Sequence, residues 1–192
     1  MTRKLEFFYD YVSTYSYLAN SQVETLGAEV IYRPMFLGAV MKATGNSPPK
    51  NVLAKGEYLD ADVARWVERY SIPYKMNPAF PQNTVNALRL ALVAQREGHF
   101  AEIHQPLFDA MWVHGKDLSD LDCLAELASQ AGLSEAQFAQ IGTDSIKDEL
   151  RKNTDEAIAR GAFGAPTFYV GDEMYFGNDR FEFIREALRN SG

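Results

Sequence analysis

Ser13 stands at the junction between an apolar run and a helical pattern. It lies in the stretch DYVSTYSYLAN, residues 10–20, shortly after the apolar run LEFFY. A serine at such a junction usually caps the helix, because its side-chain oxygen accepts a backbone N–H of the first turn. The same free N–H groups and the positive end of the helix dipole also stabilise an anion. If a ligand brings a thiol, the Ser13 hydroxyl can hydrogen-bond its thiolate and favour ionisation. Both interpretations of Ser13 stay open.

Two further segments contain residues that could recognise a ligand. In GAPTF, residues 164–168, the proline can simply make a rigid turn. A cis Ala165–Pro166 bond, which is uncommon, would leave the Ala165 N–H and C=O free to pair with an extended peptide-like ligand. In FGNDR, residues 176–180, Asn178 or Asp179 can cap the last helix. Alternatively, free N–H groups there bind a carboxylate and Asp179 binds an ammonium group. Glutathione carries a thiol, peptide bonds, a carboxylate and an ammonium group together.

The sequence lacks the residue patterns that several other kinds of functional site require. The three histidines, His99, His104 and His114, do not have the i, i+4 spacing of a zinc-binding helix, so we expect no metal site. The sequence has no G-x-S-x-G elbow, no P-loop and no G-x-G-x-x-G. Cys123 lies in an apolar helical stripe, which favours a buried structural role.

Composition limits the class of protein. The 192 residues are 46% hydrophobic, which suffices for one domain or for one domain with a large insertion. A net charge of -7 argues against nucleic acid or an anionic membrane as a partner. A lone cysteine does not call for an oxidising compartment. The N-terminal apolar run is too short for a signal peptide, and no run approaches the ~20 residues of a membrane span. We expect a cytoplasmic protein.

The elements that position these residues follow from hydrophobic periodicity. Residues 4–9 read as a buried strand, a helix follows from about Tyr15 to Leu26, and a second strand begins at Glu29. The connection is long enough for a parallel pair. Helical patterns then occupy the middle of the chain, where Pro106 should kink or break one helix. The predicted helical segments there are residues 63–70, 84–98, 100–112, 121–131, 134–137 and 146–158.

Strands return near the C-terminus. Residues 166–170 and 173–176 flank a GD pair at 171–172, which is a strong hairpin signal, and residues 178–190 form an amphipathic helix. The order is therefore β-α-β, a helical block, and β-β-α. The two ends of the chain must meet to complete one sheet, with the helical block as an insertion.

The motifs together resemble a known family. The stretch FFYDYVSTYSYLAN resembles the N-terminal signature of the 2-hydroxychromene-2-carboxylate isomerases and the related kappa-class glutathione transferases, within the DsbA-like thioredoxin superfamily. The similarity continues, in order, through MKATGNSPP, KGEYLDADVARW, AFGAPTF and DEMYFGNDRF. It implies an α/β, thioredoxin-like fold with an inserted all-helical domain. The thioredoxin-like part would be residues 1–38 plus 144–192, and the insertion residues 39–143.

The resemblance also implies a homodimeric enzyme. In each subunit, glutathione would lie in the cleft between the thioredoxin-like part and the insertion. Ser13 matches the serine that faces the glutathione sulfur, and the backbone of Ala165 matches the one that pairs with the cysteinyl part. The segment that holds the γ-glutamyl end corresponds to Phe176, Gly177, Asn178 and Asp179. Residues near the substrate correspond to Asn46, which also lies near glutathione, and to Lys42, Asn51 and Lys55.

The activity implied is isomerisation of 2-hydroxychromene-2-carboxylate to trans-o-hydroxybenzylidenepyruvate, during breakdown of naphthalene-type aromatic compounds. Tyr15, Tyr74 and Trp112 could line a flat substrate pocket, although core packing is the commoner role for each. One departure matters, because Thr14 stands where the family usually has proline.

Two alternatives stay open and one is excluded. A kappa-class-like transferase would form stable glutathione conjugates, and a binding module on the same fold would catalyse nothing. A dithiol oxidoreductase is excluded, because STYS, residues 13–16, has no sulfur where C-x-x-C is required.

Overall fold

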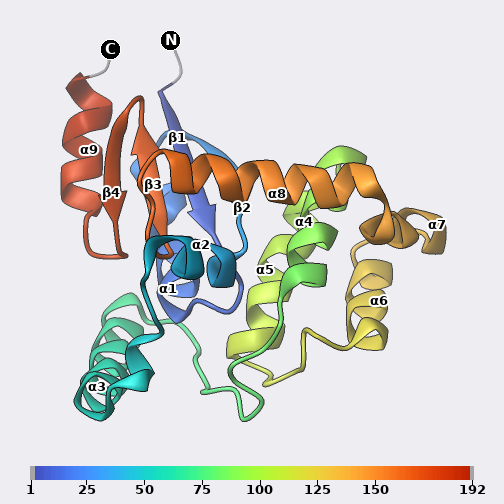
Figure 1. Cartoon of the computed structure of the whole chain (residues 1–192), viewed down its shortest axis with the longest axis horizontal. Coiled ribbons are helices and arrows are strands. Elements are labelled where there is room, and N and C mark those ends of the chain that lie inside the picture. The colour runs from blue at the N-terminus through green and yellow to red at the C-terminus, as the bar shows by residue number, and fades with distance from the viewer. Residues whose placement is uncertain (1–2, 191–192) are drawn as a thin grey trace.

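A four-stranded mixed sheet is formed by strands from the N-terminal and C-terminal parts of the chain. The computed structural model describes residues 3–190. The strands are β1 (Lys4–Tyr9), β2 (Glu29–Pro34), β3 (Thr167–Val170) and β4 (Glu173–Phe176), in the order β2-β1-β3-β4. β1 pairs parallel with β2 and antiparallel with β3, and β3 and β4 form the predicted hairpin. The two ends of the chain thus meet in one sheet, as expected (Figure 1).

The two faces of the sheet pack against different helices. Because side chains alternate along a strand, Phe7 and Tyr9 join the main core while Phe8 faces a second, smaller one. Phe7 stacks on Phe168 of β3 at 4.8 Å between ring centroids. The smaller core includes residues of α2 (Leu37–Thr44) and α8 (Asp144–Ala159). The side chains on both faces of the sheet are therefore packed against other elements.

The first crossover matches its prediction closely. α1 (Thr14–Val23) continues into a 3-10 turn, Glu24–Leu26, and ends at Gly27 in the left-handed region, with φ of 65°. α1 then leads into β2, so the β-α-β unit is formed as the sequence indicates.

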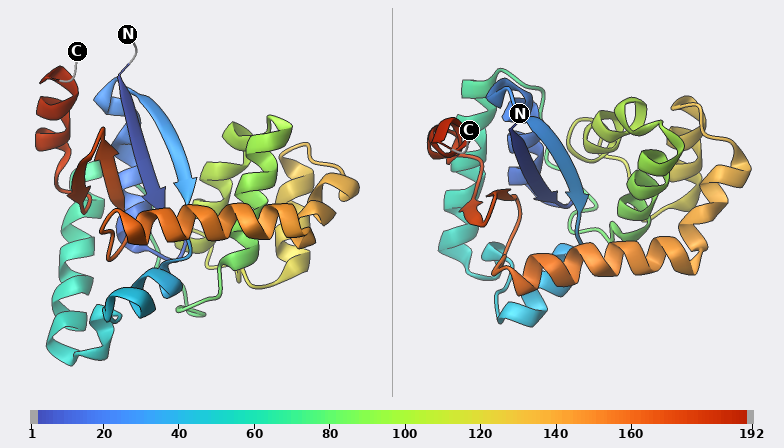
Figure 2. Two further views of the ribbon diagram at one scale, coloured as in Figure 1. Left: turned by 45° about the horizontal axis from the view of Figure 1, so that its top comes forward. Right: turned by 90° about the horizontal axis from the view of Figure 1, so that it is seen from above.

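The remaining helices lie mostly between β2 and β3 in the sequence. They are α3 (Leu53–Tyr70), α4 (Val85–Glu97), α5 (Phe100–Trp112), α6 (Leu121–Gln130) and α7 (Glu135–Phe138). α4 to α7 gather on the side of the sheet away from β4, while α3 stands apart from them (Figures 1 and 2). α7 opens with the predicted capping box at Ser134. The predicted alternative of a break at Pro106 is wrong, because α5 continues through this residue. Buried residues such as Leu107 and Phe108 hold the helix against the core.

Two further helices, α8 and α9 (Phe181–Asn190), pack against the sheet. α8 runs from the helical group back to the sheet and contacts α2, α4 and β2 (Figure 2). α9 packs on β3 and begins three residues later than expected. The proposed domain boundaries fall inside α2 and directly before α8. No helix among residues 3–190 is long and apolar enough to cross a membrane.

Candidate functional site

Ser13 caps α1. Its backbone is extended, with φ of -85° and ψ of 113°, and its Oγ accepts the backbone N–H of Ser16 at 3.1 Å. The Ser13 hydroxyl also donates to the carbonyl oxygen of Ala165 at 3.0 Å. Ser13 is 8% exposed. The cap and the hydroxyl donor are therefore the same atom, at the positive end of a helix.

Ala165 lies directly beside Ser13, although 152 residues separate them in the sequence. The Ala165–Pro166 peptide bond is cis. The Pro166 carbonyl oxygen accepts the backbone N–H of Gly177 at 3.1 Å. The segment before β3 thus joins Ser13 to the segment after β4.

The segment after β4 forms a turn next to these residues. Gly177 has φ of 101°, which a residue with a side chain rarely adopts, and a Cβ there would lie 2.8 Å from Oδ1 of Asp179. The Asn178 carbonyl accepts the Tyr70 hydroxyl at 3.1 Å, which ties the turn to α3. Asp179 pairs with Arg180. Neither Asn178 nor Asp179 caps α9, because that helix begins at Phe181.

Asn46 and Phe176 are connected through Phe163. The Asn46 side-chain amide donates to the Phe163 carbonyl oxygen at 2.8 Å. The Phe163 ring contacts the Phe176 ring, with centroids 4.5 Å apart. Phe176 in turn covers Gly164, where a Cβ would lie 2.8 Å from its ring. Contacts therefore connect Asn46 to the turn that contains Gly177.

The expected substrate-side residues are less closely joined. Lys42 near the end of α2, Asn51 before α3 and Lys55 in the first turn of α3 are all exposed. Asp62 of α3 accepts the Tyr15 hydroxyl at 2.8 Å, which ties α3 to the first turn of α1. This contact places α3, which contains Lys55, near Ser13, and the role of all three residues stays a prediction.

Two of the three candidate aromatic residues, Trp112 and Tyr74, differ in burial. Trp112 is fully buried and its Nε1 donates to the Tyr11 carbonyl at 2.8 Å, so its core role is confirmed. Tyr74 stacks on Trp112 at 5.9 Å and is half-buried. Burial raises the pKa of the Tyr74 phenol, and the neighbouring Thr14 side chain opposes that rise. Thr14, where this chain departs from the family pattern, therefore lies beside Tyr74.

Asp10 is a buried carboxylate near Ser13 that the sequence interpretation missed. It is fully buried, and burial raises the pKa of its carboxyl group while hydrogen bonds from Thr84, Leu37 and Val12 oppose that rise. The signal was a charged residue placed directly after an apolar strand.

His104 forms a buried network behind α1. Its Nε2 lies 2.8 Å from Oδ1 of Asn20, so Nε2 carries the proton, and Nδ1 accepts the Tyr11 hydroxyl at 3.0 Å. Burial lowers the pKa of His104 to about 3.

Cys123 is partly buried against the same main core, and burial raises the pKa of its thiol.

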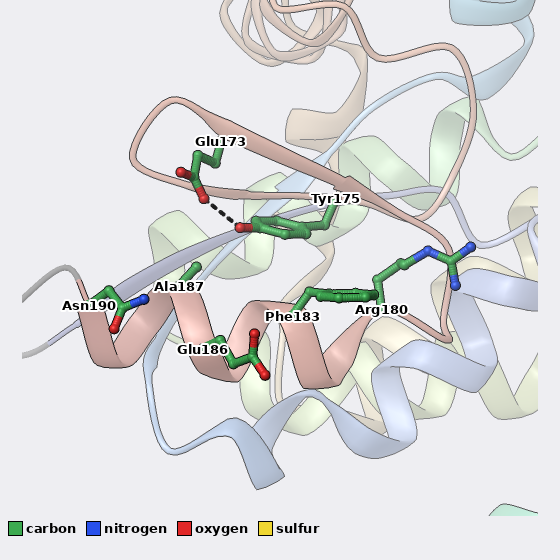
Figure 3. A pocket seen from close by; sticks show the side chains of 7 residues that line it. All are labelled: Glu173, Tyr175, Arg180, Phe183, Glu186, Ala187 and Asn190. Atoms are coloured by element: carbon green, nitrogen blue, oxygen red, sulfur yellow. Dashed lines mark hydrogen bonds between the residues drawn. The ribbon is translucent and has the colours of Figure 1, made fainter.

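A surface hollow of about 460 Å³ lies between β4 and α9 (Figure 3). Its lining residues are Glu173, Tyr175, Arg180, Phe183, Glu186, Ala187 and Asn190. None of the site residues expected from the sequence lines it. Among residues 3–190, no group of three or more His, Cys, Asp or Glu side chains is placed to hold a metal ion.

Known proteins resemble this chain along nearly its whole length. Residues 4–189 match the DSBA-like thioredoxin domain family. A 2-hydroxychromene-2-carboxylate isomerase of Sphingobium xenophagum is 30% identical, with 98% of this chain and 99% of the relative covered. Glutathione S-transferase kappa 1 of Rattus norvegicus is also 30% identical, over 97% of this chain and 91% of the relative.

A solved structure agrees with these sequence relatives. The structure of a 2-hydroxychromene-2-carboxylate isomerase superimposes with a TM-score of 0.88 at 27% identity, covering 98% of this chain and 95% of that chain. The disulfide reductase DsbM of Pseudomonas aeruginosa with GSH gives a TM-score of 0.68 over 98% of each chain, but at 17% identity it shows the shared fold alone.

Proposed function

Because this chain belongs to the 2-hydroxychromene-2-carboxylate isomerase family of DSBA-like thioredoxin domain proteins, we propose that it is a glutathione-dependent isomerase of 2-hydroxychromene-2-carboxylate. Its relatives are isomerases and glutathione transferases, which supports an enzyme. The observation that carries the proposal is the Ser13 hydroxyl at the N-terminus of α1, 3.0 Å from the Ala165 carbonyl.

The residues present fit glutathione. Ser13 supplies a hydroxyl and α1 supplies backbone N–H groups where a thiolate would lie. The Ala165 backbone lies beside Ser13 and suits the cysteinyl part of the ligand. Gly177 allows the Asp179 carboxylate to approach the backbone, because a Cβ at residue 177 would lie 2.8 Å from Oδ1 of Asp179. This carboxylate would bind the γ-glutamyl ammonium group. Phe176, Asn178 and Asn46 complete this set.

The chain's contribution is to favour the ionised thiol. Glutathione, when bound, would supply a thiolate that adds reversibly to the conjugated substrate and so permits rotation about a former double bond. A free thiol has a pKa of about 8.5, so few molecules are ionised at neutral pH. The Ser13 hydroxyl turns its proton from the Ala165 carbonyl toward the sulfur, and the α1 dipole adds to this stabilisation.

The substrate lies on the side of the insertion. Lys42 or Lys55 binds the substrate carboxylate, and Asn51 contributes a polar contact. Tyr74 provides part of the flat wall, where Thr14 adds a hydroxyl that the family's proline lacks. We include in this proposal the homodimer and the role in aromatic breakdown that the resemblance implies.

One assay separates this proposal from its alternative, a kappa-class-like transferase. The ultraviolet absorbance of the chromene is followed with and without glutathione, and the products are separated by chromatography. We expect turnover only with glutathione, all glutathione recovered unchanged, and the trans open-chain isomer as product. A persistent glutathione adduct would instead establish the transferase. If calorimetry detects no glutathione binding, both enzyme assignments are wrong and a binding module remains.

A further inference from the structure

The carboxylate of Asp10 joins three segments that are distant in the sequence. Its Oδ1 accepts the backbone N–H of Val12 at 3.1 Å and the hydroxyl of Thr84 at 2.5 Å. Its Oδ2 accepts the backbone N–H of Leu37, the first residue of α2, at 2.9 Å. Asp10 and Thr84 are both fully buried. One side chain thus connects the β1–α1 loop, the start of α2 and the start of α4.

A buried carboxylate with these partners is costly to keep. Burial of a charge is unfavourable unless hydrogen bonds satisfy it. Here the donors include two backbone N–H groups and one hydroxyl, and no Lys or Arg of residues 3–190 forms an ion pair with Asp10. Such a group stabilises one arrangement of its partners specifically, because each loses its acceptor if the segments separate.

The same residue also holds Ser13. The Asp10 carbonyl oxygen accepts the backbone N–H of Ser13 at 3.0 Å. The backbone of Asp10 therefore fixes the Ser13 loop, while its side chain fixes Thr84. Thr84 ends the loop of residues 71–84, which includes Tyr74, and it directly precedes α4.

We propose that Asp10 is a positioning residue that, through Thr84 and the Leu37 amide, fixes the inserted helices at a set distance from the Ser13 loop. This inference rests on the proposed function, in which glutathione is held by the thioredoxin-like part and the substrate by the insertion. A displacement of about 1 Å between reacting groups costs up to about 100-fold in rate. The Asp10–Thr84 hydrogen bond therefore affects the position of the chromene substrate rather than the binding of glutathione.

A set of isosteric variants tests the proposal. Thr84→Val removes the hydroxyl, Thr84→Ser keeps it, and Asp10→Asn keeps the size of the side chain but loses one acceptor. Thr154→Val is the matched control, because Thr154 is also a buried threonine whose hydroxyl accepts a backbone N–H, that of Phe36, at 3.0 Å. The measurements are the glutathione Kd by calorimetry, KM and kcat for the chromene, and amide hydrogen exchange.

For Thr84→Val we expect the chromene KM to rise about tenfold, with the glutathione Kd within about twofold of the parent. The Val12, Ser13 and Leu37 amides should lose exchange protection together. Asp10→Asn should show both effects more strongly, while Thr84→Ser should resemble the parent protein. Thr154→Val removes the acceptor of the Phe36 N–H and should lower the free energy of unfolding, but it should leave the chromene KM and the glutathione Kd unchanged. These results would support the positioning role.

Two results would overturn it. In the first, Thr84→Val and Thr154→Val change the chromene KM and the glutathione Kd alike, which means a general loss of stability. In the second, Thr84→Val leaves the Ser13 amide as protected as in the parent, which means that the segments are not coupled. If the parent protein does not turn over the chromene, the proposed function is wrong, and the exchange measurement alone decides on the coupling.

Discussion

At the scale of single residues, the Ser13 hydroxyl serves two partners, one in α1 and one in the segment before β3. It accepts an N–H from the first turn of α1 and donates to the Ala165 carbonyl. A hydroxyl can redirect its proton without moving its oxygen. The cap can therefore persist while the donor turns to a ligand, so the same oxygen can serve stability and chemistry at once.

Ser13→Ala removes both roles, and two measurements compare how large each one is. We expect the rate of chromene isomerisation to fall about 100-fold or more, as when one donor to a developing anion is removed. The loss of the cap should lower the free energy of unfolding by only about 1 kcal/mol, measured by urea denaturation.

Ser16→Ala is the matched control for this variant. Ser16 is fully buried, and its Oγ has no hydrogen-bond partner among the described residues. Its removal should leave both rate and stability nearly unchanged. Activity that survives Ser13→Ala nearly intact would mean that backbone N–H groups alone hold the thiolate.

At the scale of elements, the turn after β4 depends on backbone conformation. Gly177 and Gly161 both have positive φ, of 101° and 93°, but only Gly177 faces a site residue. The Cβ of an alanine at 177 would displace the Asp179 carboxylate, whereas nothing lies within 4 Å of the corresponding position at Gly161.

Comparison of Gly177→Ala with Gly161→Ala therefore separates strain from binding. Both variants should lose about 1 kcal/mol or more of stability, because alanine disfavours positive φ. Only Gly177→Ala should also weaken glutathione binding, raising the calorimetric Kd about tenfold, because the contact between Asp179 and the ammonium group is lost. Equal glutathione affinity in the two variants would mean that Asp179 does not bind glutathione.

The elements were predictable to the extent that their signals are local. The strand at residues 4–9 and the GD hairpin follow from apolar runs and turn residues next to one another. The role of Asp10 could not be foreseen, because its partners Leu37 and Thr84 lie 27 and 74 residues away. Likewise, α9 begins at Phe181 rather than at the predicted residue 178, because the preceding turn is fixed by contacts with Pro166 and Tyr70.

At the scale of the whole molecule, His104 links α5 to α1 through the core. The rings of Tyr9, Tyr11, Tyr32, Phe100 and Phe108 surround it. Burial lowers its pKa to about 3, so the unfolded chain binds a proton at higher pH than the folded chain does. The free energy of unfolding should therefore fall as the pH drops from about 6.5 toward 3.

Thermal unfolding of the parent and of His104→Gln at pH 7 and pH 5 checks this dependence. The variant should be less stable at pH 7, because it loses its packing, but its stability should change less between the two values. Asp10, whose pKa is raised, is present in both proteins and cancels in the comparison. An equal pH dependence in parent and variant would contradict the assignment to His104.

The proposed homodimer is also a property of the whole molecule. Large apolar side chains are exposed at the start of α3, with Leu53 77% and Tyr58 64% exposed. Exposed apolar patches commonly mark interfaces between proteins. Sedimentation equilibrium should therefore give twice the chain mass of 21.6 kDa, and a single-chain mass at micromolar concentration would rule the dimer out.

The account depends most on the claim that Ser13 and the N-terminus of α1 ionise a bound thiol. Thiolate absorbance of bound glutathione, titrated with pH in the parent and in Ser13→Ala, measures this directly. We predict a thiol pKa of about 7.5 or lower in the parent, against about 8.5 for a free thiol, and a value close to the free one in Ser13→Ala. A bound thiol that titrates near 8.5 in both proteins would contradict the account.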